Sequence, residues 1–257
     1  LLWTEANDID FKYHYLVEDS YSNDRIPDWY SNLNQSESRK QFESHIRNIT
    51  KRYKGRVAIY DVANHALFHR RDRNNNYMNT GWTREEAITR AFQWADEEDP
   101  DAILLVNDGS EGKEFLGEST SEEYANFVKR LLERGAPIDG IGIHGHLGKG
   151  NAKLLDDEKI IESLNIFAST GLPIYVTEFD LSYVEIAGFN PDATFEADGI
   201  IYNNWWDYQA YAYKHFYELI SSHDSVVSIF SWGFYDGAVG RNGSGLFDEN
   251  FEALLYW

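Results

Sequence analysis

Polar side chains that could bind or transform a ligand follow six short apolar runs of the sequence. The residues at these run ends are His14, Glu18 and Asp19; Asn64 and His65; Asn107 and Asp108; His144 and His146; Glu178 and Asp180; and Trp232. Imidazoles and carboxylates transfer protons, orient nucleophiles and bind metals. One such residue is often only a cap or a turn residue. Six consecutive runs that end this way predict a common pocket.

The runs themselves predict six strands, and helical patterns separate them. The predicted strands cover residues 11–17, 57–62, 102–107, 140–146, 174–179 and 226–232. The predicted helices cover residues 37–53, 84–97, 121–133, 157–169 and 204–221, with Thr83, Thr120 and Asp156 among their capping residues. This alternation is typical of βαβ units in a parallel sheet.

The apolar pattern of the strands favours a barrel over an open sheet. The runs AILLV (102–106) and VVSIF (226–230) are continuous, as expected of strands buried on both faces. A doubly wound nucleotide-binding sheet would carry a glycine-rich turn after a strand, and no such motif is found there. We therefore predict six βα units of a (β/α)₈ TIM barrel, in which all strand ends open onto one face.

Composition limits the classes of partner. The 257 residues can bury one core, so a single domain over 1–257 is expected. A formal charge of -20 disfavours nucleic acid and anionic membranes, and no apolar run is long enough to span a bilayer. The start, LLWTEANDID, lacks a signal-peptide pattern, so the numbering is expected to begin inside a mature protein or a fragment. An aromatic content of 16% suits either sugar stacking or an aromatic-rich core.

Several segments resemble the motifs of glycoside hydrolase family 10, the xylanase family. IYDVANHAL (59–67) is similar to its W-D-V-x-N-E-A signature, and PIYVTEFDLS (173–182) to its I-x-[IV]-T-E-[LF]-D strand. IDGIGIHGHL (138–147) is similar to I-D-G-I-G-x-Q-x-H-L. Weaker similarities lie in KYHYLVEDSYSNDRIPDWY (12–30), NDG (107–109), FSWGFYDG (230–237) and the final GLFDENFEALLYW. The similarities follow the family order along the whole chain.

The resemblance implies a secreted protein that binds xylan-type polysaccharide or oligosaccharide without a cofactor. Family 10 enzymes are retaining, so one carboxylate attacks the sugar and a second acts as acid and base. By motif, Glu178 is the nucleophile and His146 orients it. Asn64 would contact the sugar 2-hydroxyl, Trp232 would form an aromatic floor, and His14 matches an active-site histidine.

Four departures from the family pattern affect the predicted site. His65 stands where the acid/base glutamate is expected, His144 replaces a glutamine beside the nucleophile, and Asp19 replaces a second histidine. A family tryptophan is missing from 237–241. The predicted catalytic residues are thus Glu178, His65 and His146. The predicted substrate-binding residues are His14, Asp19, Asn64, His144 and Trp232.

The resemblance also implies that two strands and a helix of the family barrel precede this segment. Six strands cannot close an eight-stranded barrel, so an additional N-terminal segment or a companion chain is expected to complete it.

Three hypotheses for the site remain. The first is a glycosidase in which His65 replaces the carboxylic acid, and the second is a non-catalytic glycan-binding or structural relative. The third is a metal site that includes His65, His144 and His146.

Overall fold

The structure is a computed structural model that describes most of the chain. The described residues are 1–18, 27–68, 77–109, 118–147, 157–181, 190, 192–236, 245–248 and 250–253. Asp19, the predicted cap Asp156 and the segment 237–241 lie outside the described residues.

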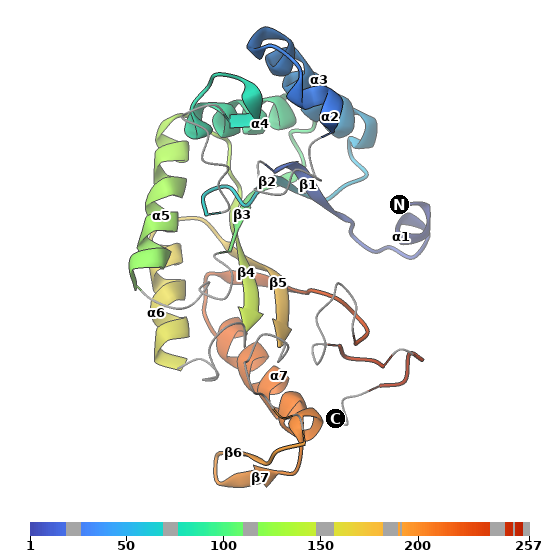
Figure 1. Ribbon diagram of the computed structural model, residues 1–257, viewed down its shortest axis with the longest axis vertical. Helices are drawn as coiled ribbons and strands as arrows, with labels where there is room; N and C mark the ends of the chain where they lie inside the picture. Colours follow the sequence, from blue (N-terminus) through green and yellow to red (C-terminus); the bar gives the residue numbers. More distant parts are fainter. Residues whose placement is uncertain are drawn as a thin grey trace. The chain divides into compact units, whose positions relative to one another are not determined.

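Six strands form one sheet, as the sequence predicts. They are β1 (Lys12–Glu18), β2 (Ile59–Asn64), β3 (Ile103–Asp108), β4 (Gly140–Leu147), β5 (Ile174–Leu181) and β8 (Val226–Ser231). Their order in the sheet is β1-β2-β3-β4-β5-β8, and the pairs β1–β2, β2–β3 and β5–β8 are parallel. With the helices between them, these strands form six βα units of a (β/α)₈ fold (Figure 1). Trp232, predicted inside the last strand, directly follows it.

Helices follow the strands at the predicted places. They are α1 (Leu2–Ala6), α2 (Asp28–Ser31), α3 (Gln35–Tyr53), α4 (Arg84–Glu98), α5 (Glu118–Glu133), α6 (Asp157–Ala168) and α7 (Trp205–Ser221), with a short 3₁₀ turn η2 (Tyr77–Asn79). The short elements α1, α2 and η2 were not predicted. Neither was the antiparallel hairpin of β6 (Phe195–Ala197) and β7 (Ile200–Tyr202).

Capping residues set the starts of α3 and α4. Thr83 caps α4 by accepting a hydrogen bond from the Glu86 N–H, as predicted. Helix α3 begins two residues earlier than predicted, because Asn34 and Glu37 form a reciprocal capping box. The prediction of Thr120 as a cap is wrong, since α5 already begins at Glu118. A hydroxyl residue is tolerated in the first turn of a helix as well as at its cap.

The described chain divides into two compact units. The first comprises residues 1–108, 123–142 and 170–172, and the second comprises 109–122, 143–169 and 173–257. In the first unit, α3 and α4 lie beside one another (Figure 1). Phe42 and Ile46 of α3, together with Ile88 and Phe92 of α4, are fully buried. Arg47 joins the two helices through ion pairs with glutamates of α4.

In the second unit, α6 and α7 pack against β5 and bury an aromatic core. Phe167, Phe179 and Phe216 are almost completely buried, and so is Trp205 at the start of α7. The β6–β7 hairpin lies against the first turns of α7 (Figure 1). There the ring of Phe195 stacks on Tyr208, with ring centroids 5.1 Å apart.

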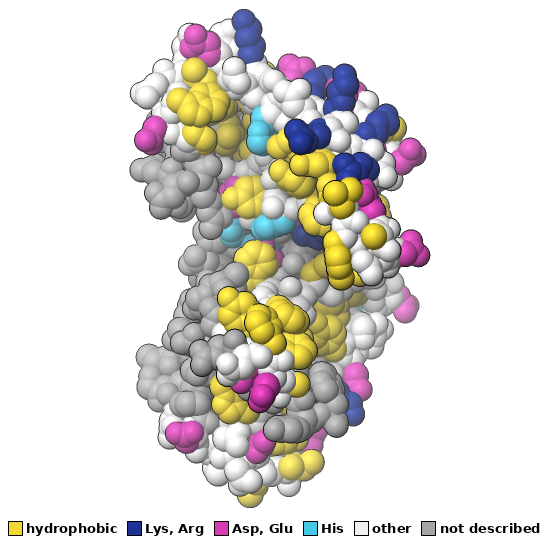
Figure 2. Space-filling view, turned by 90° about the vertical axis from the view of Figure 1, so that its right-hand side faces the viewer, with side chains coloured by type: hydrophobic (Ala, Val, Ile, Leu, Met, Phe, Trp, Pro, Cys, Tyr) yellow, Lys and Arg dark blue, Asp and Glu magenta, His cyan; other side chains and the backbone are white. Residues whose placement is uncertain are grey.

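The last strand corrects one expectation. VVSIF was expected to be buried on both faces, but β8 is only partly buried and Val227 is 54% exposed. The reason is that β8 ends the sheet order and pairs with β5 alone in the described sheet. Other hydrophobic side chains are also visible on the surface (yellow in Figure 2), and Phe234 and Phe251 are more than half exposed. Within the described ranges, no helix is both long and apolar enough to cross a membrane.

Candidate active site

Strand periodicity places the key polar residues of the second unit on one side of their strands. Successive side chains of a strand point to opposite faces, so residues two apart share a face. His144 and His146 are two apart on β4, and Glu178 and Asp180 are two apart on β5. All four are buried, in strands that are themselves buried along their whole length.

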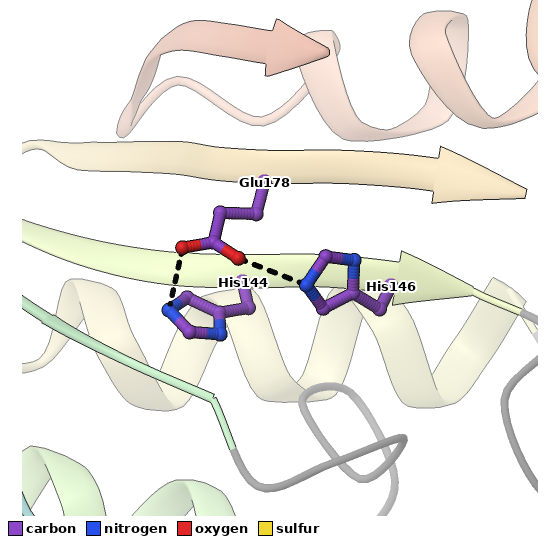
Figure 3. A group of neighbouring side chains, drawn as sticks. All are labelled: His144, His146 and Glu178. Atoms are coloured by element: carbon purple, nitrogen blue, oxygen red, sulfur yellow. Dashed lines mark hydrogen bonds and ion pairs between the residues drawn. The ribbon is translucent and has the colours of Figure 1, made fainter. Parts of the chain in front are cut away.

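The carboxylate of Glu178 lies between two imidazoles (Figure 3). Its Oε1 atom lies 3.2 Å from His144 Nε2, and its Oε2 atom lies 3.0 Å from His146 Nε2. Asp180 holds the other side of the second ring, with 2.8 Å between His146 Nδ1 and Asp180 Oδ2. Both oxygens of Glu178 are thus engaged, and the orientation of its carboxylate is determined by β4.

His146 therefore lies between two carboxylates. A neutral imidazole carries one N–H, so hydrogen bonds from both ring nitrogens require an imidazolium or a protonated carboxyl group. Burial makes an unpaired charge costly, whereas a paired and hydrogen-bonded charge is tolerated. This arrangement orients Glu178.

Two neighbours shape the position of the histidine rings. A Cβ atom at Gly109 would lie 2.4 Å from His144 Cβ and 2.5 Å from its Nδ1, so only glycine fits against this ring. The indole of Trp232 meets His146 edge to face, with centroids 6.1 Å apart. The backbone N–H of Trp232 donates to the Phe179 carbonyl at 2.8 Å, which ties the indole to the strand that carries Glu178.

A second polar group lies at the strands of the first unit. Asp61 of β2 is fully buried; it forms an ion pair with Lys12 and a hydrogen bond with His14, whose Nδ1 lies 2.7 Å from Asp61 Oδ2. Asn64 donates to Glu18 at 3.0 Å. Its Oδ1 atom accepts a hydrogen bond from Asn107 Nδ2 at 2.8 Å, so a chain of side-chain hydrogen bonds links β1, β2 and β3.

His65 directly follows β2 and has a left-handed backbone. Its φ is +46°, a conformation that costs most residues energy but in which histidine is enriched. Its Nδ1 atom lies 3.9 Å from Asp108 Oδ1, and its side chain is 16% exposed. Asp108 is held in turn by the backbone N–H groups of Leu67 and Phe68. The imidazole thus stands next to a carboxylate that the backbone has already fixed.

The structure assigns each predicted residue to its unit. His14, Asn64 and His65 lie in the first unit, and His144, His146, Glu178 and Trp232 lie in the second. Sequence reasoning gave no role to Asp61 or Gly109, and it named Asp180 only as one of the polar residues at the strand ends. A charged residue inside the apolar run IYDVAN is a signal that could have identified Asp61. No comparable signal marks Gly109, because its partner lies 35 positions away.

Parallel βα units with carboxylates and imidazoles at the carboxyl ends of their strands define a (β/α)₈ protein of the kind that builds its site there. The profile of Glycosyl hydrolase family 10 matches residues 1–255, and the chain belongs to this family.

Known relatives agree with this assignment. Endo-1,4-beta-xylanase B of Thermotoga neapolitana is 31% identical over 239 residues, which cover 88% of this chain and 62% of that protein. Beta-1,4-xylanase of Dictyoglomus thermophilum is 32% identical over 220 residues, which cover 82% of this chain and 57% of that protein. The chain thus spans about three fifths of the length of these relatives.

A solved structure supports the fold. Xylanase 10B of Thermotoga petrophila RKU-1, in complex with xylobiose, is 27% identical to this chain and superposes with a TM-score of 0.73. The match covers 98% of this chain and 72% of that one.

Proposed function

We propose that this chain binds xylan-type polysaccharide and that Glu178 is the nucleophile of a retaining hydrolysis, with His65 in place of the usual carboxylic acid. The observation that carries the proposal is the carboxylate of Glu178, which two imidazoles hold by both of its oxygens. A nucleophile must be presented in one orientation to attack efficiently. The xylobiose bound by the Thermotoga petrophila relative supports the substrate class.

The proposed reaction has two steps. A Glu178 oxygen attacks the anomeric carbon and forms a glycosyl ester, while the bond to the leaving oxygen breaks and that oxygen takes a proton from the His65 imidazolium. In the second step, neutral His65 accepts a proton from water, which attacks the same carbon and releases Glu178. His65 is then an imidazolium again, so the cycle closes.

The exchange of a carboxylic acid for an imidazole predicts a particular substrate preference. A sugar leaving group needs full protonation, whereas an activated phenol leaves with little help from an acid. Loss of a well-placed general acid costs about 10² to 10⁴ in rate. We therefore expect cleavage of aryl xylosides with good leaving groups to exceed cleavage of xylan by a wide margin.

The remaining predicted residues receive positioning and binding roles. We assign orientation of Glu178 to His146, contact with the sugar 2-hydroxyl to Asn64, and stacking beneath the ring to Trp232. His14, Asp19 and His144 complete the proposed substrate-binding set. Because the substrate is an extracellular polymer, we also infer that the protein acts outside the cell.

The test uses the full-length protein and an aryl 2-deoxy-2-fluoroxyloside, which traps a glycosyl enzyme. Mass spectrometry is expected to place the adduct on Glu178, and Glu178→Gln is expected to lose both the adduct and aryl xyloside turnover. Glu162→Gln removes an exposed glutamate of α6 in the same unit and serves as the control.

Two results would overturn the catalytic part of the proposal. One is an adduct on another residue, and the other is the absence of both adduct and turnover. If calorimetry then shows binding of xylooligosaccharides, the chain is a glycan-binding relative without catalysis. Absence of binding as well would remove the proposal altogether.

A further inference from the structure

We propose that His144, His146 and Glu178 bind one divalent first-row transition metal ion, with Zn²⁺ as the reference ion. Each residue offers one ligand atom, and these three atoms all lie within 4.8 Å of one another. Imidazole nitrogen and carboxylate oxygen are typical ligands for zinc. The three side chains come from two adjacent strands and point toward one another (Figure 3).

A tetrahedral ion requires an adjustment of these side chains, because the two imidazoles contact different oxygens of Glu178 and the ligand atoms lie within 4.8 Å of one another. Metal–ligand bonds of about 2.0–2.2 Å place tetrahedral ligands roughly 3.3 Å apart. The two contacts of Glu178 with the imidazole nitrogens are 3.2 and 3.0 Å. The two rings are inclined by 71°, with centroids 5.5 Å apart, so they approach Glu178 from different directions. Three protein ligands would leave the fourth position to water or a sugar hydroxyl.

A second carboxylate, that of Asp180, forms a hydrogen bond with the proposed ligand His146. Metal-binding histidines usually donate their other ring N–H to a carboxylate or carbonyl, which fixes the tautomer and the ring orientation. Asp180 is fully buried and accepts this bond from His146 Nδ1 at 2.8 Å, which leaves Nε2 directed at Glu178. The contact with Gly109 limits the ring of His144 in a comparable way.

His144 distinguishes this group from the family motif that the chain resembles. That motif carries glutamine at this position, and an amide oxygen is a weaker zinc ligand than an imidazole nitrogen. With His144, the group has two imidazoles and a carboxylate, all buried. Buried carboxylates are paired or coordinate metals. A divalent cation would neutralise the negative charge of Glu178.

Metal binding would compete with the proposed hydrolysis. An ion bound to Glu178 would occupy the oxygen that attacks the anomeric carbon, so zinc is expected to inhibit turnover and a chelator to restore it. This consequence rests on the proposed function. The binding itself does not, because it can be measured without any substrate.

The experiment uses the full-length protein, carrying no histidine tag and freed of metal by chelator dialysis. Calorimetric titration with Zn²⁺ is expected to show one site per chain, and Co²⁺ is expected to give the intense visible absorption of a tetrahedral complex. His144→Gln is expected to weaken binding at least about 100-fold, and Asp180→Asn about 10- to 100-fold. His215→Gln is the matched control, since His215 forms a comparable 2.9 Å contact with Asp157 but belongs to no such group among the residues that the structure describes.

Absence of metal uptake by the wild-type protein would overturn the proposal, as would unchanged affinity in His144→Gln.

Thermal unfolding in the presence and absence of Zn²⁺ provides a second readout. The midpoint is expected to rise with zinc in the wild type and in His215→Gln, because a ligand of the folded state stabilises it. If His144→Gln fails to fold, Asp180→Asn decides, and wild-type affinity in that variant would also refute the site. The two proposals can fail independently. Zinc binding without turnover would support this proposal and contradict the proposed hydrolysis. Turnover without zinc binding would do the reverse.

Discussion

The Nε2 atom of His146 lies 3.0 Å from Oε2 of Glu178, while the opposite ring nitrogen lies 2.8 Å from Asp180. The histidine therefore links two carboxylates of the same strand. Because β4 and β5 are adjacent in the sheet, this link does not depend on a loop. Glu178 is presented by a rigid part of the fold, which suits a nucleophile and equally suits a metal ligand.

Restoring a carboxylic acid at position 65 tests the proposed proton donor. His65→Glu is expected to raise kcat/KM on xylan by about 10² to 10⁴, because a general acid contributes that much. Cleavage of an aryl xyloside with a good leaving group should change far less. Reducing-sugar and chromogenic assays measure the two rates.

His65→Gln, which supplies neither acid nor base, is the control for this substitution and should not gain xylan activity. The left-handed backbone at residue 65 adds a small cost of about 1 kcal/mol for glutamate, visible as a lower unfolding midpoint. Equal xylan activity in wild type and His65→Glu would contradict the assigned role.

The close approach of Gly109 to His144 predicts a steric effect. Gly109→Ala should lower the free energy of unfolding by about 1–3 kcal/mol, because the new Cβ would overlap the His144 side chain. It should also weaken the binding of ligands at Glu178. Chemical denaturation and calorimetry measure the two effects.

Gly171→Ala separates crowding from backbone strain. Gly171 has a φ of +81° but open space where a Cβ would stand. That variant should lose stability while ligand binding stays unchanged. Unchanged stability and binding in Gly109→Ala would show that the His144 ring is not held by this contact.

Asp99 predicts a pH dependence of stability. Burial raises the pKa of its carboxyl group above the ordinary value, although the Gly55 N–H donates to it. A raised carboxyl pKa stabilises the fold only where the group is protonated, and this stabilisation is lost as the pH rises through the raised pKa. Asp99→Asn should therefore gain stability relative to wild type between about pH 3 and pH 7.

Thermal unfolding across this pH range measures the effect. Asp101→Asn, which changes an exposed carboxylate nearby, should show a much smaller trend. A constant stability difference between wild type and Asp99→Asn at all pH values would refute the explanation.

The capping box at the start of α3 predicts a local loss of stability. Asn34→Ala should cost about 1 kcal/mol, because the N–H of Glu37 loses its acceptor. Lys40→Ala, on the exposed face of the same helix, is the control. Urea denaturation measures both, and equal stability of the two variants would contradict the role of the cap.

The strands could be predicted from sequence because each carries a local signal. β-branched and apolar runs of five to eight residues bounded by polar residues identified all six strands of the sheet within two residues at each end. The hairpin of β6 and β7 was missed because its strands are only three residues long. Short elements depend on tertiary contacts rather than on their own pattern.

The sequence by itself determined the family, the order of the βα units, and the fact that His144 and His146 share one face of their strand, as Glu178 and Asp180 share one face of theirs. All of these follow from local patterns, above all from the two-residue period of a strand. Only the tertiary structure decided that His146 is held between Glu178 and Asp180, and that His144 rests against Gly109. These contacts join residues more than thirty positions apart. They depend on the register in which strands pair, which no single segment encodes.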